Sequence, residues 1–285
     1  MGQYEKLNEE IQGGNNLRIL IIDNNNLEFC IQNEPFFPAN TIFDNYDIIL
    51  TPEWVHSEIA HSDRRLQYLA SIPKPSYILS EEEDYTRLVD YQDYRLMKLF
   101  DYASSSITKA RKKMGEFKKF YAIEQDLPDN WIADFCDNAF EINETTGPAG
   151  EMIELRKNAG ETSILVLAYL LVHHYSSKIS RITIFSSDKG SLTIKEHIMD
   201  NLGKMELTHN AKIPITFKTT DILIAEACKD GRIQSSDILS IRSNPRTVIY
   251  TELLDDRTTH RYKGVLDTNE FIKLVDSLDK YHIEF

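Results

Sequence analysis

Short apolar runs that end in acidic or turn-forming residues recur along the chain and predict buried β-strands. The first is Ile19 to Ile22, which Asp23 and three asparagines follow. Continuous apolar runs of this kind, without alternation, are typical of strands in a parallel sheet that is covered on both faces. The predicted strands are Arg18 to Asp23, Asp47 to Leu50, Arg181 to Phe185 and Ile213 to Phe217.

Helical patterns fill the segments between these strands. Thr51 and Pro52 fit the N-cap and first residue of a helix, and the Ser-Glu-Glu-Glu run from Ser80 fits a capping box. The first predicted helix begins at about Pro52. The other predicted helices are Ser80 to about Tyr102, Ile107 to about Ile123, Asn130 to Phe140, Glu161 to Tyr175 and Ile222 to about Cys228. The helix over 161–175 is apolar almost all round, so we expect it to be buried on most sides.

This alternation of strands and helices predicts an α/β fold, with a central parallel sheet and helices on both faces. Two parts of the chain depart from it. Residues 80–147 show helical patterns and no predicted strand, so we interpret them as a helical insertion. Near the end of the chain, 247–253 and 259–266 predict a β-hairpin, and 269–278 a closing helix. We therefore predict a domain over 15–235 that the insertion interrupts, followed by a C-terminal α+β extension over 240–285.

Composition and charge narrow the class of protein. The chain is 41% hydrophobic and 27% charged, which is ordinary for a globular protein. It contains no apolar run of the roughly 18 residues that a membrane span needs, and residues 1–12 are too polar for a secretory signal, so we expect a cytoplasmic protein. The net charge is -13. Such a chain repels phosphate backbones at long range, and nucleic acid would bind it only at a local basic patch or through bound cations.

Four acidic residues are predicted to share one crevice. Ligands of open parallel sheets bind outside the carboxyl ends of the strands, where Asp23 and Asp188 follow predicted strands. Glu58 lies in the helix after the second strand, and Glu161 opens the long buried helix. Four like charges in one crevice disfavour each other's ionisation, and a divalent cation removes that conflict. Mg²⁺ or Mn²⁺ suits such a half-open set of oxygen ligands and also suits phosphodiester chemistry.

The segments that carry these acids resemble, in order, the four acidic motifs of PIN-domain ribonucleases. They are RILIID from Arg18, TPEWVHSEI from Thr51, AGETSILVLAYLL from Ala159 and ITIFSSDKGSL from Ile182. IPITFKTTDILIAEACKDGRI, from Ile213, also resembles the last strand and helix of that family. The resemblance covers about 17–60 and 150–233. Glu58 and Glu161 lie farther apart than a compact PIN domain needs, which implies an insertion, and Ser187 stands where many members carry a further acid or threonine.

The resemblance implies a metal-dependent endoribonuclease. Asp23, Glu58, Glu161 and Asp188 would be its catalytic residues, with Mg²⁺ or Mn²⁺ held by Asp23, Glu161 and Asp188. PIN-like proteins include RNA-cleaving toxins, rRNA-processing enzymes and effectors of phage defence. With its large insertion and C-terminal extension, this chain is more similar to an effector that a partner protein restrains than to a minimal toxin.

Each acid also has a purely structural interpretation. Asp23 fits a turn, Glu58 fits a solvated helix face, Glu161 complements a helix dipole and Asp188 fits a turn cap. Asp221 is expected to be an N-cap. A phosphatase with D-x-D after its first strand would need an acid at Asn25, and a dinucleotide-binding domain would need the G-x-G-x-x-G that is missing here. The main alternative is a PIN-like scaffold without turnover that serves as a binding subunit of a larger assembly.

The segment Lys109 to Lys119, which we call the basic segment, is an exception in an acidic chain. It carries one acid, Glu116, against the cationic residues Lys109, Arg111, Lys112, Lys113, Lys118 and Lys119. Phe117, Phe120 and Tyr121 lie in or beside it. The segment is either a solvated helix face or an RNA-binding surface whose cations contact phosphates and whose aromatic rings stack on bases. Lys189, directly after Asp188, is a further candidate for contact with a substrate phosphate, or simply an exposed turn residue.

Overall fold

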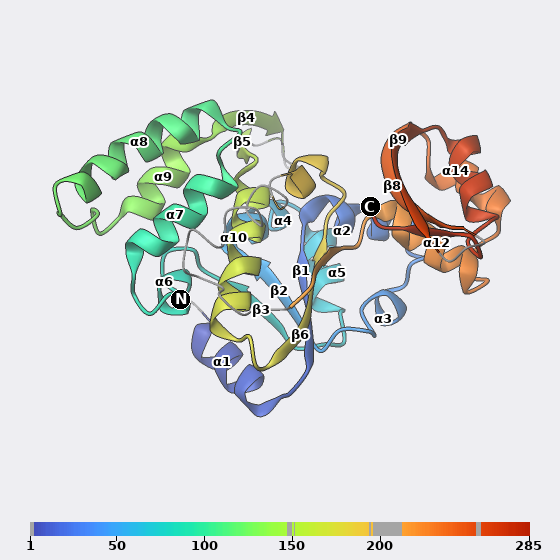
Figure 1. Cartoon of the computed structure of the whole chain (residues 1–285), viewed down its shortest axis with the longest axis horizontal. Coiled ribbons are helices and arrows are strands. Elements are labelled where there is room, and N and C mark those ends of the chain that lie inside the picture. Colours follow the sequence, from blue (N-terminus) through green and yellow to red (C-terminus); the bar gives the residue numbers. More distant parts are fainter. Residues whose placement is uncertain (1–2, 147–149, 151, 194, 196–212, 255–257) are drawn as a thin grey trace.

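The fold is a five-stranded parallel sheet with helices packed around it, in the α/β class that the sequence predicts (Figure 1). The computed structural model describes residues 3–146, 150, 152–193, 195, 213–254 and 258–285. In the sheet the strand order is β3-β2-β1-β6-β7. Its strands are β1 (Leu17–Ile22), β2 (Ile48–Pro52), β3 (Ser76–Leu79), β6 (Ile179–Phe185) and β7 (Ile215–Phe217).

The central strands are buried on both faces, as their continuous apolar runs predict. All five residues of β2 and the last four residues of both β1 and β6 are buried. The long helix α10 (Ala159–His174) packs against β1, β2 and β6, and its residues from Thr162 to Val172 are all buried. The prediction of a helix enclosed on most sides is confirmed.

Shorter helices complete this part of the fold. They are α1 (Tyr4–Gly13), α2 (Asn24–Gln32), α3 (Ala39–Ile42), α4 (Glu53–Ile59), α5 (Asp63–Ala70) and α12 (Thr220–Lys229). The expected N-cap at Thr51 is wrong, because Thr51 and Pro52 still pair with Ile78 and Leu79 of β3. Helix α4 therefore begins one residue later than predicted, at Glu53.

The insertion is mainly helical and ends in two strands. It contains α6 (Tyr85–Leu88), α7 (Asp93–Ala103), α8 (Thr108–Ala122) and α9 (Trp131–Ala139). The helix predicted to start at Ser80 is wrong, because Ser80 N donates to Asp84 Oδ2 at 2.8 Å in a turn that precedes α6. The prediction of no strand is also wrong, since β4 (Glu141–Thr146) pairs antiparallel with β5 (Met152–Lys157).

Aromatic side chains join this insertion to the domain. The Phe100 ring of α7 lies 5.5 Å from that of Trp54 in α4, measured between centroids, and 5.9 Å from that of Trp131 in α9. Figure 1 shows α7, α8 and α9 together at one end of the molecule, in green. The insertion thus shares one core with the sheet domain.

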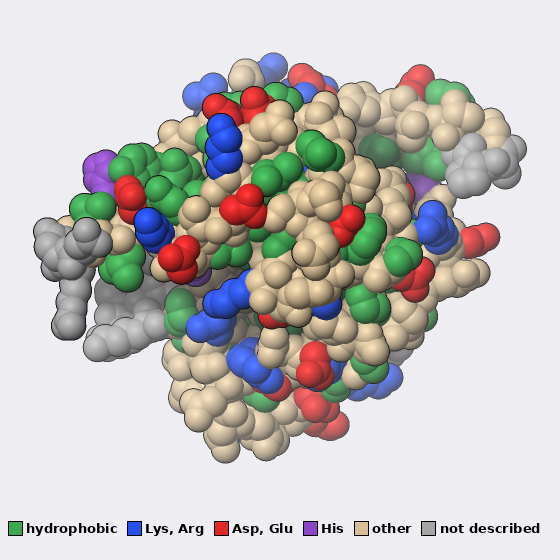
Figure 2. All heavy atoms as spheres, turned by 90° about the vertical axis from the view of Figure 1, so that its right-hand side faces the viewer, with side chains coloured by type: hydrophobic (Ala, Val, Ile, Leu, Met, Phe, Trp, Pro, Cys, Tyr) green, Lys and Arg blue, Asp and Glu red, His purple; other side chains and the backbone are tan. Residues whose placement is uncertain are grey.

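The C-terminal extension lies at the other end of the molecule in Figure 1. It comprises η2 (Ser235–Asp237), α13 (Ile238–Ile241), β8 (Arg246–Leu253), β9 (Thr259–Leu266), α14 (Thr268–Val275) and β10 (Tyr281–Ile283). The predicted hairpin of β8 with β9 and the closing helix are confirmed, and β10 adds an unpredicted third strand beside β8. Seen from this side, basic and acidic side chains are interspersed over the surface (Figure 2).

Membrane-spanning helices are absent from the part of the chain that the structure describes. None of its helices combines the length and the apolar character needed to cross a bilayer.

Candidate functional site

The candidate site lies where β1 and β6 leave the sheet side by side. Ile22 is in register with Phe185, and the backbone N–H of Asp23 donates to Phe185 O at 3.2 Å. Asp23 and Ser186, the first residues beyond these strands, are therefore neighbours although they are far apart in the chain. This is the carboxyl edge of a parallel sheet, the edge at which the sequence predicts a ligand.

Ser186 connects the two aspartates of this edge. Its Oγ donates to Asp23 Oδ2 at 2.6 Å and accepts from the backbone N–H of Asp188 at 3.1 Å. Asp23 is only 4% exposed and Ser186 is fully buried, whereas Asp188 is half-buried. Ser186 was not predicted as a site residue, and its place directly after β6 was the only sequence signal for it.

The two glutamates reach the site from α4 and α10, which pack against each other. Gly160 favours their close approach, because a Cβ there would crowd Val55 Cγ2 at 3.1 Å and would lie 3.4 Å from Glu58 Oε1. The half-buried Glu58 carboxylate consequently lies against the first turn of α10. Glu161 is the next residue in that turn and is also half-buried.

The electrostatics connect these four residues, which we call the acidic cluster. Burial and, to a smaller extent, the Asp188 charge raise the pKa of Asp23 to about 6, while the Ser186 hydrogen bond opposes the rise. Burial and the Asp23 charge raise the pKa of Glu58 to about 7. Burial followed by the charges of Asp23, Asp188 and Glu58 raises the pKa of Glu161 to about 8. The structure thus brings all four predicted acids within electrostatic reach of one another.

Cations do little to compensate the acidic cluster. Among the described residues, Arg65 is the cation whose charge lowers the pKa of Glu58, but burial and the Asp23 charge outweigh it, and its guanidinium is engaged with Glu28 at 2.6 Å. At neutral pH the cluster therefore either retains protons or carries uncompensated negative charge.

The carboxylate oxygens are turned toward protein donors. Asp23 accepts from Ser186, and Asp188 Oδ1 accepts from the backbone N–H groups of Gly190 and Ser191. In this arrangement, no group of three or more His, Cys, Asp or Glu side chains among the described residues is placed to hold a metal ion. The donor set itself is the hard-oxygen kind that Mg²⁺ and Mn²⁺ prefer, and Asp23, Glu161 and Asp188 are the predicted residues that could supply oxygens to such an ion.

A second polar network borders the acidic cluster. Ser187 Oγ donates to Asn26 Oδ1 at 2.7 Å and accepts from the backbone N–H of Thr220 at 3.0 Å, and Asn26 Nδ2 donates to Lys218 O at 2.8 Å. Ser187 thus joins α2 to the start of α12. Sequence reasoning noted Ser187 only as a departure from the PIN pattern and missed Asn26 altogether.

Asp221 has a different role from the predicted N-cap. The cap of α12 is Thr219, whose Oγ1 accepts from Ile222 N at 3.2 Å. Asp221 is instead a buried ion-pair partner: its oxygens accept from Arg242 Nε and Nη2 at 3.0 to 3.2 Å and from Arg246 Nη1 at 3.3 Å. It ties α12 to the C-terminal extension.

The basic segment forms α8, and part of its charge is compensated within the insertion. Lys113 pairs with Asp134 at 2.8 Å and with Glu116 at 3.1 Å, and Lys118 pairs with Asp101 at 2.7 Å. Lys109, Arg111, Lys112 and Lys119 are exposed, and no ion pair of theirs is found in the described part of the chain.

The aromatic residues of this segment differ in their accessibility. The Phe117 side chain is buried and packs on Trp131, so the prediction that it could stack on bases is wrong. Tyr121 is exposed and packs edge-on against Tyr94. Lys189, beside the acidic cluster, is exposed.

Sequence reasoning also missed a buried carboxyl group after β3. Glu81 Oε1 accepts from Ser163 Oγ at 2.6 Å and from the backbone N–H of Trp54 at 3.2 Å, while Oε2 is buried without a hydrogen-bond partner. Burial raises the pKa of Glu81 to about 8, so it is mostly protonated at neutral pH. Its charge is not among those that shift the acidic cluster.

Comparison with known proteins identifies no relative: no protein family, no curated protein sequence and no solved structure matches this chain.

Proposed function

We propose that the acidic cluster binds Mg²⁺ or Mn²⁺ and hydrolyses RNA phosphodiester bonds. The observation that carries this proposal is the mutual electrostatic repulsion of Asp23, Glu58, Glu161 and Asp188 near the carboxyl edge of the sheet, where Arg65 is the one described cation that lowers any of their raised pKa values. Such a gathering destabilises the folded protein, because each charge disfavours the others. A divalent cation converts the repulsion into attraction, which gives the cluster a purpose that packing alone does not.

The acids divide into two roles. Asp23 and Asp188 follow β1 and β6, and Glu161 lies in the first turn of α10; these three would hold the ion. Glu58 lies on α4, where burial and the Asp23 charge raise its pKa to about 7 in the absence of an ion, and a carboxylate with a raised pKa suits a group that exchanges a proton near neutral pH. We assign it the role of accepting a proton from the attacking water. The ion would act as a Lewis acid that lowers the pKa of water and offsets charge on the phosphate.

RNA is the substrate class that the resemblance to PIN-domain ribonucleases favours. The exposed cations of α8 and Lys189 supply local positive charge in a chain whose net charge is -13. Backbone phosphates would bind there without sequence selection. A toxin or phage-defence effector that a partner protein restrains is the cellular role we infer.

A binding scaffold without turnover is the second candidate. The carboxylate hydrogen bonds to Ser186, Gly190 and Ser191 favour it, because these bonds satisfy the acids without an ion. In that case the acidic cluster would be a polar surface for a partner protein. The two candidates differ in their dependence on a divalent cation.

The experiment that separates the two candidates is an RNA cleavage assay. Purified protein is incubated with single-stranded RNA in Mn²⁺, in Mg²⁺ and in excess chelator, alongside the Asp23→Asn and Glu161→Gln variants. Losing a metal ligand removes several kcal/mol of transition-state stabilisation, so we expect turnover to fall by about a thousandfold. Asp279→Asn makes the same change at an exposed site and should retain full activity.

Cleavage that persists in chelator, or that survives Asp23→Asn, would reject metal-dependent hydrolysis. Absence of cleavage by the wild-type protein in both metals would favour the scaffold. The target itself is identified by expressing the protein and its Asp23→Asn variant in cells and sequencing the RNA ends that accumulate.

A further inference from the structure

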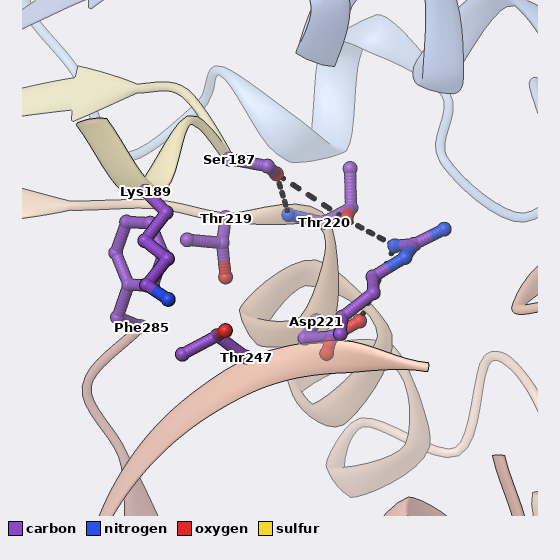
Figure 3. A pocket seen from close by; sticks show the side chains of 8 residues that line it. Ser187, Lys189, Thr219, Thr220, Asp221, Thr247 and Phe285 are labelled. Atoms are coloured by element: carbon purple, nitrogen blue, oxygen red, sulfur yellow. Dashed lines mark hydrogen bonds and ion pairs between the residues drawn. The ribbon is translucent and has the colours of Figure 1, made fainter. Parts of the chain in front are cut away.

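A cavity of about 230 Å³ with charged and hydroxyl side chains in its walls lies between the sheet domain and the C-terminal extension. Its walls come from the loop after β6, the first turn of α12, the start of β8 and the end of the chain. The lining residues are Ser187, Lys189, Thr219, Thr220, Asp221, Arg246, Thr247 and Phe285 (Figure 3). Ser187 and Lys189 are the chain neighbours of Asp188, so the loop after β6 contributes residues both to the cavity and to the acidic cluster.

The charge of this cavity is positive despite its one carboxylate. Asp221 is only 3% exposed and is already paired with Arg242, which is fully buried. Arg246 also contacts Asp221 but is about one-third exposed, and Lys189 is exposed. Among the side chains that line the cavity, the two cations Arg246 and Lys189 outnumber the single carboxylate of Asp221. The cavity therefore attracts an anion.

Hydroxyl groups complete the lining. Arg246 Nη1 donates to Thr220 Oγ1 at 2.6 Å, which fixes the guanidinium at the cavity wall. In the view of Figure 3, the Lys189 side chain extends toward the hydroxyl groups of Thr219 and Thr247, next to the Phe285 ring. A cationic fork, an ammonium group and several hydroxyls match the oxygens of a phosphate group. A carboxylate ligand has only two oxygens and would leave some of these donors without a partner, so a phosphate group fits the cavity better.

We propose that this cavity holds a backbone phosphate of the RNA strand, next to the phosphate that the acidic cluster cleaves. This inference rests on the proposed function and adds to it a positioning site that the C-terminal extension helps to build. A strand whose scissile phosphate lies at Asp23 and Asp188 passes Lys189 as it leaves the acidic cluster. Contacts to a neighbouring phosphate fix the register of such a strand.

The test is RNA binding in chelator, where no metal-dependent cleavage occurs. Affinity of a single-stranded RNA for the full chain is measured across a salt series for wild type, Lys189→Gln and Thr247→Val. We expect Lys189→Gln to weaken binding about tenfold, the loss of one charge-assisted hydrogen bond, and to flatten the salt slope by about 0.7. Thr247→Val keeps the charge and shape of the strand residue and should weaken binding by a smaller factor without a change in slope.

Lys229→Gln is the matched control. It removes the same charge from an exposed residue at the opposite end of α12 and should leave affinity unchanged. Thermal melting of each variant shows that the fold is intact. Equal affinities for wild type and Lys189→Gln would overturn the assignment of the cavity.

Two further measurements separate this inference from the proposed function. RNA binding that depends on Lys189, in a protein that cleaves nothing in Mn²⁺, would support the cavity and reject the catalysis. Metal-dependent cleavage with unchanged binding in Lys189→Gln would reject the cavity and any contact of Lys189 with a phosphate, and would leave the catalysis standing. Adenosine monophosphate and inorganic phosphate are titrated as probes of a free ligand; Lys189-dependent binding of either one, without any binding of RNA, would overturn the RNA assignment.

Discussion

Asp23 and Asp221 are two buried aspartates near the same edge of the sheet, and they have opposite surroundings. Asp23 follows β1 and is 4% exposed, and Asp221 lies in the first turn of α12 and is 3% exposed. Asp221 receives two arginines, whereas Asp23 receives a serine hydroxyl and the repulsion of other carboxylates. The charge of Asp221 is thus compensated by arginines, whereas the charge of Asp23 lies near other negative charges.

We interpret this difference as the one between a structural residue, Asp221, and a residue of the proposed site, Asp23. A buried ion pair with several hydrogen bonds holds two parts of a fold in place, as Asp221 does for α12 and the C-terminal extension. An uncompensated acidic group does nothing for stability and persists where something outside the chain supplies the missing charge. The same contrast recurs on α8, where Lys113 and Lys118 are paired within the insertion and Lys112 and Lys119 are exposed.

The largest effect is expected from breaking the compensated pair. Asp221→Asn leaves the fully buried Arg242 without its counter-charge, so we expect the free energy of unfolding to fall by about 3–5 kcal/mol. Urea denaturation of the variant and of wild type measures the change. A loss below about 1 kcal/mol would mean that the Asp221 pair does not anchor the extension.

The pH dependence of stability should reveal the acidic cluster in the absence of divalent ions. Because the folded-state pKa values of Asp23, Glu58 and Glu161 are raised above 3.8, 4.5 and 4.5 to about 6, 7 and 8, the folded protein binds more protons than the unfolded chain in this window. Stability is therefore highest near pH 4 as far as these groups are concerned, and falls as pH rises toward 8. Each retained proton contributes up to about 1.4 kcal/mol per pH unit.

Urea denaturation at a series of pH values in chelator measures this slope. Glu161→Gln should make it shallower, because the residue with the most raised pKa of the three no longer titrates. A slope that Glu161→Gln leaves unchanged would show that the acidic cluster is not the source.

A smaller and opposite effect is expected when the uncompensated aspartate is neutralised. Asp23→Asn removes a buried charge that Asp188 repels, so at pH 7 in chelator we expect the variant to be more stable by about 1 kcal/mol. The Ser186 hydroxyl retains an acceptor in the asparagine oxygen. A destabilisation as large as that of Asp221→Asn would erase the distinction between the two aspartates.

The smallest effect concerns RNA affinity at α8. We compare two double variants that each lose two positive charges. One carries Lys112→Gln and Lys119→Gln, and the other carries Lys113→Gln and Lys118→Gln. Loss of Lys112 and Lys119 should flatten the salt slope of RNA binding by up to about 0.7 for each phosphate contact. Loss of Lys113 and Lys118, which form ion pairs within the insertion, should change the slope less. Identical slopes for both variants and wild type would show that α8 is a solvated face.

Sequence patterns predicted the strands and helices whose own residues form continuous apolar runs. The apolar runs at β1, β2 and β6 and the enclosed helix α10 are mostly buried, and the short edge strand β7 has two buried residues out of three, so each carries a clear apolar signature. Strand β3 has only one buried residue, and all of β4 is exposed, so neither carries such a signature. Both depend on pairing with another strand, which the sequence does not display.

The site shows the same division. Asp23 and Asp188 follow recognisable strands, and Glu161 opens a recognisable helix, so their meeting at one edge follows from the parallel topology. The role of Asp221 depends on Arg242 and Arg246, which a later part of the chain brings to it. The Ser-Glu-Glu-Glu run from Ser80 resembled a helix start. The Glu81 side chain is instead buried against Ser163, a contact between distant parts of the chain that the local sequence does not signal.

The most direct test of the central claim, that the acidic cluster exists to hold a divalent cation, is calorimetric titration of the full chain with Mn²⁺ at pH 7. Glu161 and Glu58 are partly protonated at this pH, so an ion that binds them or their neighbours releases protons. Titration in buffers with different ionisation heats measures that release. We expect Mn²⁺ to bind wild type with proton release and to bind Asp23→Asn far more weakly, while Asp279→Asn behaves as wild type. Mn²⁺ binding that is absent from wild type, or unchanged in Asp23→Asn, would contradict the assignment of the acidic cluster as a cation site.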